Sequence, residues 1–283
     1  MSVQTTFRIA AVQMDVQLGK VAENLGTILS RLRDATAQGA NLVVFPECAL
    51  SGYGFASREE GLSSAVGTDG PEIEKIAQAC AELGVHCVLG LLERDGAKLF
   101  NAAALIGPKG LVGIYRKVHL PFMGVDRFVD HGDRPFEVLD AGGIRVGIHI
   151  CYDAGFPEPG RVLSLLGADL LVVPTNWPTL TECAAEHVIP ARAMENTVYA
   201  IAVNRVGEES GCRFIGRSSI VDPNGSVLAF GSPDREEILV AEIDVNRARR
   251  KHIVRVPGER EVNRIGDRRP GFYGAIVAPN GRD

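Results

Sequence analysis

The chain has 283 residues, of which 46% are hydrophobic and 23% charged, and its formal net charge is −5. This composition is that of a folded globular protein and excludes disordered, collagenous and coiled-coil chains. The longest apolar runs fall far short of the ~20 residues that a membrane-spanning helix needs, and the first residues lack the basic and apolar regions of a signal peptide. We therefore expect a cytoplasmic protein without membrane contact.

Strand and helix patterns alternate along the first half of the chain. Apolar side chains recur at helical spacing in 24–37, and 71–83 begins with proline and is followed by Gly84, the arrangement typical of a helix. Asp-Gly at 95–96 and Pro-Lys-Gly at 108–110 mark turns between short β-type runs. The strands expected here are 7–14, 41–45, 85–92, 99–106, 111–115 and 136–139.

The second half repeats this alternation, which predicts an α/β protein with mixed sheets and helices outside them. No internal repeat and no low-complexity linker divides the chain, so we expect one domain. The expected strands are 144–150, 170–174, 198–204, 216–221 and 226–230, and the expected helices are 158–166 and 182–196.

Charge and cysteines give two further expectations. Residues 245–283 carry ten Lys and Arg against four acids, or +6, which leaves −11 for the rest of the chain. Because this tail lacks interleaved aromatic residues, we do not expect nucleic-acid binding but packing on its own acidic body or on a partner subunit. The six cysteines show no zinc-ligand spacing and are expected to be reduced thiols.

Three segments place a reactive side chain at the end of an apolar strand, where binding crevices form in α/β sheets. Val-Val-Phe-Pro-Glu places Glu47, Ile-Tyr-Arg-Lys-Val-His places Lys117, and Gly-Ile-His-Ile-Cys-Tyr-Asp places Cys151. A cysteine between a strand and a helix can meet backbone N–H groups and the positive helix end, which favour thiolate. Taken singly, however, a cysteine in such a position is more often an inert core thiol, a glutamate is more often a solvated loop residue, and a lysine is more often a surface charge.

In this order the three motifs resemble the nitrilase superfamily, the carbon–nitrogen hydrolases. The resemblance extends through Gly-Ala-Asp-Leu-Leu-Val-Val-Pro-Thr-Asn-Trp-Pro and Ala-Arg-Ala-Met-Glu-Asn, and it covers about residues 7–244. It implies a single domain folded as a four-layer α-β-β-α sandwich that pairs into a homodimer or a higher homo-oligomer. It also implies that the arm, residues 245–283, crosses the dimer interface.

The resemblance also implies roles for the three residues. Cys151 is expected to be the nucleophile, Glu47 the general base, and Lys117 the oxyanion stabiliser, assisted by the backbone N–H of Tyr152. These types suit the chemistry, because a thiol is mostly protonated at neutral pH and needs a nearby carboxylate to take its proton. No metal or organic cofactor is required.

Two neighbouring residues leave alternatives open. Many relatives carry a second catalytic Glu between the Lys and Cys motifs; the nearest acid here is Asp126, a candidate second acid that positions substrate or Lys117, or that pairs with Arg127. His149, two residues before Cys151, would form a Cys–His dyad or be a packed, hydrogen-bonded histidine. We favour the packed histidine, because strand rise separates the two side chains by about 6–7 Å, which is long for proton transfer.

The sequence indicates the substrate less directly than it indicates the reaction. Cys-Tyr-Asp looks like the amidase and carbamoylase branches, whereas nitrilases typically read Cys-Trp-Glu. Relatives that hold a carboxylate often place Arg just after the nucleophile, but this chain has Ala154 and Gly155 there. We therefore expect a small neutral amide, with an N-carbamoyl compound or a nitrile as the alternative and a catalytically silent binding protein as the remote one. Three arginines could substitute from elsewhere: Arg161, Arg192 and Arg205.

Aromatic and amide side chains near the motifs are expected to line the pocket. Tyr53 follows the Glu47 motif, and Asn176 and Trp177 follow the strand at 170–174. For Trp177, a place in the core or at an interface is as well supported as a place in the pocket.

Overall fold

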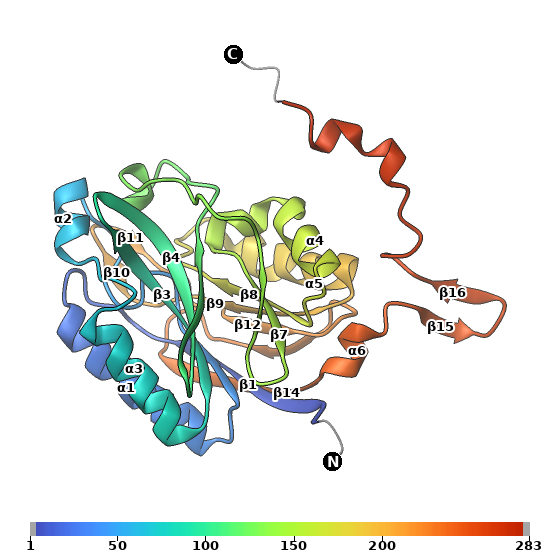
Figure 1. Cartoon of the computed structure of the whole chain (residues 1–283), viewed down its shortest axis with the longest axis horizontal. Coiled ribbons are helices and arrows are strands. Elements are labelled where there is room, and N and C mark those ends of the chain that lie inside the picture. Colours follow the sequence, from blue (N-terminus) through green and yellow to red (C-terminus); the bar gives the residue numbers. More distant parts are fainter. Residues whose placement is uncertain (1–3, 280–283) are drawn as a thin grey trace.

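The computed structural model describes residues 4–279, in which two six-stranded sheets lie face to face with helices on their outer sides (Figure 1). The first sheet has the order β14 (Glu237–Asp244), β1 (Thr6–Gln13), β2 (Leu42–Val44), β3 (His86–Asp95), β4 (Lys98–Gly107), β5 (Gly110–Arg116). The second has the order β13 (Val227–Phe230), β12 (Ser219–Val221), β9 (Tyr199–Val203), β8 (Leu170–Pro174), β7 (Arg145–Ile148), β6 (Val138–Asp140).

Helices α1 (Val21–Ala37) and α3 (Pro71–Leu83) cover the first sheet, and α4 (Pro157–Leu165) and α5 (Ile189–Asn196) cover the second. The predicted α-β-β-α sandwich is therefore confirmed. Shorter elements complete the description: α2 (Arg58–Ser63), α6 (Val245–Arg249), and the strand pairs β10 (Glu208–Glu209) with β11 (Cys212–Arg213) and β15 (Ile253–Val256) with β16 (Arg260–Val262).

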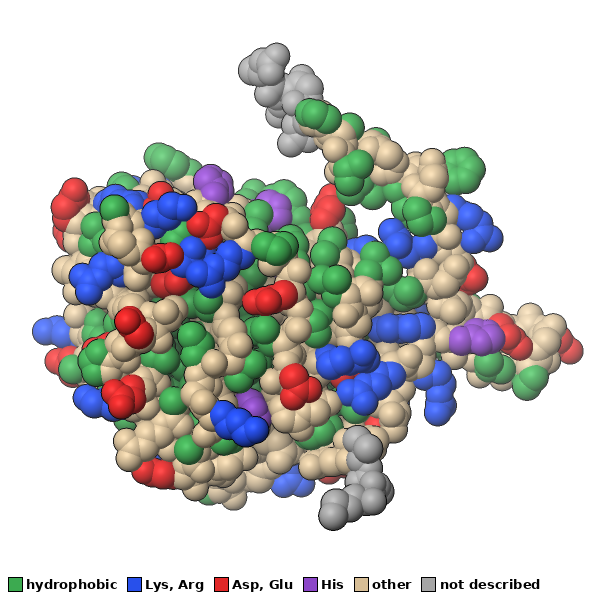
Figure 2. Space-filling view, viewed as in Figure 1, with side chains coloured by type: hydrophobic (Ala, Val, Ile, Leu, Met, Phe, Trp, Pro, Cys, Tyr) green, Lys and Arg blue, Asp and Glu red, His purple; other side chains and the backbone are tan. Residues whose placement is uncertain are grey.

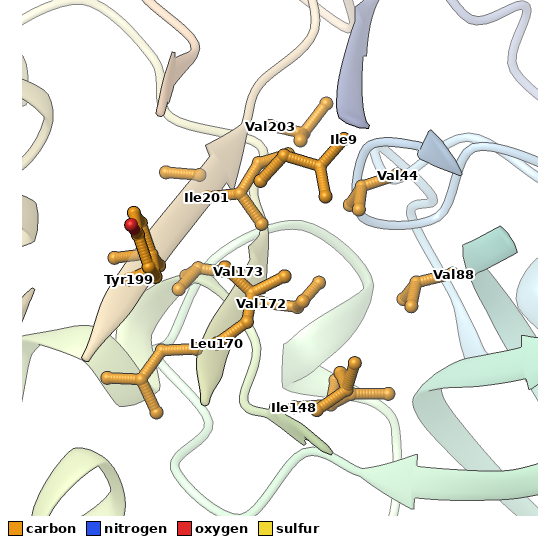
Figure 3. Packing of buried hydrophobic residues seen from close by; sticks show 14 of the residues in the cluster. Ile9, Val44, Val88, Ile148, Leu170, Val172, Val173, Tyr199, Ile201 and Val203 are labelled. Atoms are coloured by element: carbon orange, nitrogen blue, oxygen red, sulfur yellow. The ribbon is translucent and has the colours of Figure 1, made fainter. Parts of the chain in front are cut away.

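The core lies in layers because successive strand residues point to opposite faces of a sheet. In β1, Ile9 faces the second sheet, whereas Ala10 belongs to the cluster under α1 and α3. Figure 3 shows the layer between the sheets, to which both contribute branched side chains: Ile9, Val44, Val88, Ile148, Val172 and Ile201. This dry layer fixes the two sheets against each other and so fixes the loops at their edges.

Strand direction brings the three motif segments to the same end of the two facing sheets. β2 runs parallel to β1 and β3, while β4 runs antiparallel to both β3 and β5. The carboxyl ends of β2 and β5 and the amino end of β4 therefore meet at the same edge of the first sheet. In the second sheet β7, β8 and β9 are parallel, and the segments after β7 and β8 reach the same region.

The short elements α2, α6, β10, β11, β15 and β16 were not predicted, and two larger differences from the sequence prediction concern α5 and β14. The helix expected at 182–196 begins as a π-helical turn, Ala184–Val188, and becomes α-helical only at Ile189. Pro190 explains this, because it has no N–H to donate to the preceding turn. Strand β14 was not predicted; it pairs antiparallel with all eight residues of β1, a contact between the two ends of the domain.

The basic arm leaves the body of the protein. At its start, Arg247 pairs with Asp222 at 2.8 Å and Arg249 pairs with Asp169 at 2.7 Å. The β15–β16 hairpin and the residues after it then project away from the sandwich (Figures 1 and 2). The last residues of the predicted arm, 280–283, lie outside the described residues. Among residues 4–279, no helix is both long and apolar enough to cross a membrane.

Candidate active site

The three motif residues come from three strand ends and meet in the interior. Glu47 lies in the turn after β2, Lys117 directly follows β5, and Cys151 begins a 3-10 turn after β7. Glu47 and Lys117 are each 1% exposed and Cys151 is 7% exposed. The charges of Glu47 and Lys117 both act on the pKa of the Cys151 thiol, so the structure brings all three together.

Lys117 holds two carboxylates. Its Nζ donates to Glu47 Oε1 at 2.7 Å and to Asp126 Oδ2 at 2.6 Å. Burial alone would lower the pKa of Lys117, but the two carboxylates outweigh burial and raise it well above its usual value, so the ammonium stays charged. Of the alternatives left open for Asp126, pairing with Arg127 is not found, since that guanidinium donates to two backbone carbonyls.

Tyr53 lies over the ion pair between Lys117 and Asp126. Its hydroxyl donates to Asp126 Oδ2 at 2.8 Å, and its ring centroid is 5.9 Å from Lys117 Nζ. Glu209 fixes the Tyr53 backbone by accepting its N–H at 2.8 Å, and Arg205 in turn donates to Glu209 at 2.7 Å. Tyr53 is thus held from both ends.

Asn101, which the sequence analysis missed, joins the two acids. Its side-chain nitrogen donates to Glu47 Oε1 at 2.7 Å and to Asp126 Oδ1 at 2.8 Å. It lies near the amino end of β4, at the edge where the three motifs meet. The available signal was an amide side chain inside the otherwise apolar stretch Leu99–Ile106.

The Glu47 carboxyl has a raised pKa. Burial is the largest cause, and the nearby charge of Asp126 adds to it, while Lys117 and Asn101 act in the opposite direction. One oxygen, Oε1, accepts from both Lys117 and Asn101. The other, Oε2, is buried and has no hydrogen-bond partner among the described residues. A carboxylate with a raised pKa and a free oxygen is suited to accept a proton.

The turn that carries Glu47 lies directly against Gly90 of β3. A Cβ atom at position 90 would lie 2.2 Å from Pro46 O and 2.6 Å from the Glu47 Cα. Since both are backbone atoms, no side-chain rotation could relieve the clash. Glycine at position 90 is therefore what allows Glu47 to reach the site.

We expect Gly90→Ala to lower the free energy of unfolding by about 1–3 kcal/mol, as overpacking in a core does, and to displace Glu47. Thermal or denaturant unfolding measures the loss. Gly26→Ala is the matched control, because a Cβ there meets nothing within 4 Å and alanine favours a helix. Equal stability of the two variants would contradict this close approach.

The pKa of the Cys151 thiol is raised well above its usual value, mainly by burial and then by the Glu47 charge. These two effects outweigh the local features that favour a thiolate. Lys117 and a backbone hydrogen bond at Asn176 lower the pKa by less. The residue has a left-handed backbone with φ +47°, as a sharp strand-to-turn change requires. The resting group is a thiol that must lose its proton to react.

Asp153, also missed, fastens the Cys151 turn to the segment after β5. Its Oδ2 accepts from the Tyr115 hydroxyl at 2.8 Å and from the Ile150 N–H at 2.9 Å. Its Oδ1 accepts from the backbone N–H of His119 at 3.0 Å and lies 2.7 Å from the ring Nδ1 of that residue. One buried carboxylate thus sets the nucleophile turn relative to the segment that carries Lys117.

His149 is packed, as expected, but its side chain is not hydrogen-bonded to any residue that the structure describes. Its side chain is fully buried, and neither ring nitrogen has a partner among the described residues. Burial lowers its pKa to about 4, so the ring is neutral at physiological pH.

The other predicted residues divide between surface and interior. Tyr152 is 46% exposed and packs edge-on against Phe156. Asn176 is 1% exposed, and both of its side-chain polar atoms lack partners among the described residues. Trp177 belongs to the same apolar cluster as Cys151, and its backbone is held by the Asn204 side chain.

The arginines proposed as substitutes are already engaged. Arg205 is fully buried and pairs with Glu209 and Asp15, each at 2.7 Å. Arg192 pairs with Glu195 at 2.8 Å, and Arg161 donates to the backbone carbonyl of Glu195. Arg192 and Arg205 therefore do not offer a free guanidinium to a substrate carboxylate, contrary to that expectation.

A small cavity of about 150 Å³ lies beside Tyr53, and its walls include Met123, Pro178 and Phe214 together with the charged residues Arg127 and Glu209. In the part of the chain that the structure describes, no group of three or more His, Cys, Asp or Glu residues is arranged to hold a metal ion.

Comparisons with known proteins show the family of the chain. A family model described as carbon–nitrogen hydrolase matches residues 8–252. A Pyrococcus abyssi protein named nitrilase is 40% identical over 94% of this chain and 98% of its own length. A Pseudomonas protein named (R)-stereoselective amidase is 34% identical over 97% of this chain and 96% of its own. A solved structure of an amidase variant from Nesterenkonia sp. AN1 is similar, with a TM-score of 0.77 and 26% identity, and covers 94% of this chain and 95% of its own. That structure is described as carrying the acetamide moiety of fluoroacetamide on its active-site cysteine.

Proposed function

The chain belongs to the carbon–nitrogen hydrolase family and is an amidase-like enzyme, and from this premise we propose that it hydrolyses small neutral amides through Cys151. The observation that carries the proposal is the buried group around Lys117, in which one ammonium holds two carboxylates beside a buried thiol. Glu47 is the general base, Lys117 the oxyanion stabiliser, and Asp126 the acid that positions Lys117.

The first half of the reaction forms a thioester. Glu47 Oε2 takes the proton of the Cys151 thiol while Sγ attacks the amide carbon, and the carbonyl π electrons move to oxygen. The resulting oxyanion is stabilised by Lys117 Nζ and the backbone N–H of Tyr152. The C–N bond then breaks, and Glu47 gives its proton to the departing nitrogen, so ammonia leaves.

The second half releases the acid. Glu47 takes a proton from water, which attacks the thioester carbon and again forms an oxyanion. When the C–S bond breaks, the proton returns to Sγ and the thiol is restored. Because burial raises the pKa of Glu47 above its usual value, the carboxylate is a stronger base that can accept this proton and return it within the same cycle.

The surroundings support a small uncharged acyl group. The cavity of about 150 Å³ beside Tyr53 offers Met123 and Phe214 to an apolar substituent, and its charged residues Arg127 and Glu209 already bind backbone groups of this chain. The unpartnered side-chain atoms of Asn176 offer one donor and one acceptor near Cys151 for the carboxamide of the substrate. Trp177 is buried in the same apolar cluster as Cys151.

The test is ammonia release from a panel of aliphatic and aryl amides, N-carbamoyl amino acids and nitriles. We expect turnover of small neutral amides and much slower turnover of the carboxylate-bearing compounds. Turnover confined to nitriles or carbamoyl compounds would overturn the substrate proposal. A panel without turnover, together with no acylation of Cys151 by the same amides in mass spectrometry, would overturn the enzymatic proposal.

We further propose that two copies pair through α4 and the C-terminal arm. On α4, Val162 and Leu165 are 38% and 45% exposed, and on the arm Phe272 is 86% exposed. A groove of about 900 Å³ separates these surfaces within one chain. Exposed apolar surfaces of this kind usually mark a site where another protein chain binds.

We expect removal of all residues after His252 to convert dimers to monomers in analytical ultracentrifugation, because the arm would no longer cover the partner. The cut keeps Arg249 and Lys251, which bind the body. Phe272→Glu should weaken the dimer, whereas Leu180→Glu, at a residue 95% exposed elsewhere, should not. A dimer that survives both the truncation and Phe272→Glu would contradict an arm-dependent interface.

The cysteines support a reducing, cytoplasmic setting as a further proposal. All six are free, and Cys183 and Cys212 are exposed. Free exposed thiols persist where cellular reductants keep them reduced.

A further inference from the structure

Asn101 makes a paired contact that the reaction scheme above does not use. Its side chain is 1% exposed, and both hydrogens of its amide nitrogen are donated, one to Glu47 Oε1 and one to Asp126 Oδ1. Its oxygen lies 3.6 Å from the Cys48 thiol. Since every polar group of this amide is engaged, its orientation is fixed.

This arrangement decides which oxygen of Glu47 is available. Oε1 accepts from both Lys117 and Asn101, each at 2.7 Å. Oε2 is buried without a partner among the described residues. We propose that Asn101 is a positioning residue, which together with Lys117 turns the Glu47 carboxylate so that Oε2 alone is free to take the thiol proton. This inference rests on the proposed function.

The Asn101 amide carries no charge, and this affects how basic Glu47 is. The titratable groups around Glu47 come from several segments. Lys117 follows β5, Cys151 follows β7, and Cys48 is the next residue after Glu47. Asp126 lies in a separate turn, and the Tyr53 hydroxyl is bound to its carboxylate. A second cation in place of the amide would stabilise both carboxylates but would make Glu47 a poorer base. The amide instead gives each carboxylate one hydrogen bond without adding charge.

The test compares Asn101→Leu, which keeps the volume and removes both donors, with the full chain. We expect kcat/KM for an amide substrate to fall by about 10²-fold, the usual loss when a reacting group is misplaced by about 1 Å. The acid limb of the kcat/KM–pH profile should move to higher pH, because the Asn101 hydrogen bond lowers the pKa of Glu47 and is lost.

Asn196→Leu is the matched control. Asn196 is also fully buried, but its side-chain nitrogen donates to the Arg192 carbonyl on α5, away from Glu47. This variant should lose stability without any movement of the pH profile. If Asn101→Leu does not fold, Asn101→Ser, which retains one donor, should show a smaller shift in the same direction.

The outcomes separate the two proposals. Full activity of Cys151→Ala would overturn the proposed function itself. An inactive Cys151→Ala combined with an unmoved acid limb in the folded Asn101 variant would overturn only the positioning role. A shift that appears equally in Asn196→Leu would do the same, because it would then reflect a general structural effect.

Discussion

Replacing Cys151 by alanine is expected to abolish amide hydrolysis, with a loss in kcat of up to roughly 10⁶-fold, as found when a covalent nucleophile is removed. Without Sγ no thioester forms, and the remaining groups have no atom to activate for attack. The variant should remain folded, since it removes one atom from a side chain that is 7% exposed. Ammonia release and circular dichroism on the same sample measure both expectations.

Cys183→Ala is the control, because that thiol is exposed and lies just before the π-helical turn that begins the α5 region. It should retain full activity. Mass spectrometry after incubation with substrate should find the acyl adduct on Cys151 in the parent chain and in Cys183→Ala. An acyl group on any other residue would contradict the assignment of Cys151.

Lys117→Met is expected to damage activity and stability together. The rate should fall by about 10²- to 10³-fold, the cost of removing a preorganised oxyanion donor. The free energy of unfolding should fall by about 3–5 kcal/mol, because Glu47 and Asp126 would be left as buried carboxylates without their shared cation. Kinetics at substrate saturation and denaturant unfolding measure the two losses.

Lys98→Met provides the comparison. Lys98 also pairs with an acid, Asp133 at 3.0 Å, but its side chain is 55% exposed. An exposed ion pair contributes only about 0–1 kcal/mol, so this variant should be nearly as stable as the parent and equally active. If the two lysine variants lost similar stability, the central role given to the buried ammonium would be wrong.

Much of the fold follows from local patterns. The helix at Pro71–Leu83 agrees to the residue, because proline at its start and Gly84 in a left-handed conformation at its end are local signals. Strand β14 escaped detection, because it is defined by pairing with β1 across more than 200 residues. Likewise the π turn before Ile189 results from Pro190 within an otherwise regular helical pattern.

The candidate site shows the same division. Glu47, Lys117 and Cys151 could be selected from the sequence because each stands in a motif at a strand end, and the motif order matched a known family. Asn101 could not, since a single amide in an apolar strand has no motif of its own. The three-dimensional path of β4 alone brings it between two acids.

By itself, the sequence determined an α/β protein and three candidate reactive residues, because these depend on side-chain identity and periodicity along the chain; the layered sandwich followed from the resemblance that the motifs carry to the nitrilase superfamily. Only the tertiary structure decided how those residues are charged and aimed. Burial keeps Cys151 protonated, Lys117 is shared between Glu47 and Asp126, and one oxygen of Glu47 stays free. These properties depend on desolvation and on charges a few ångströms away in space, contributed by strands that are distant in sequence.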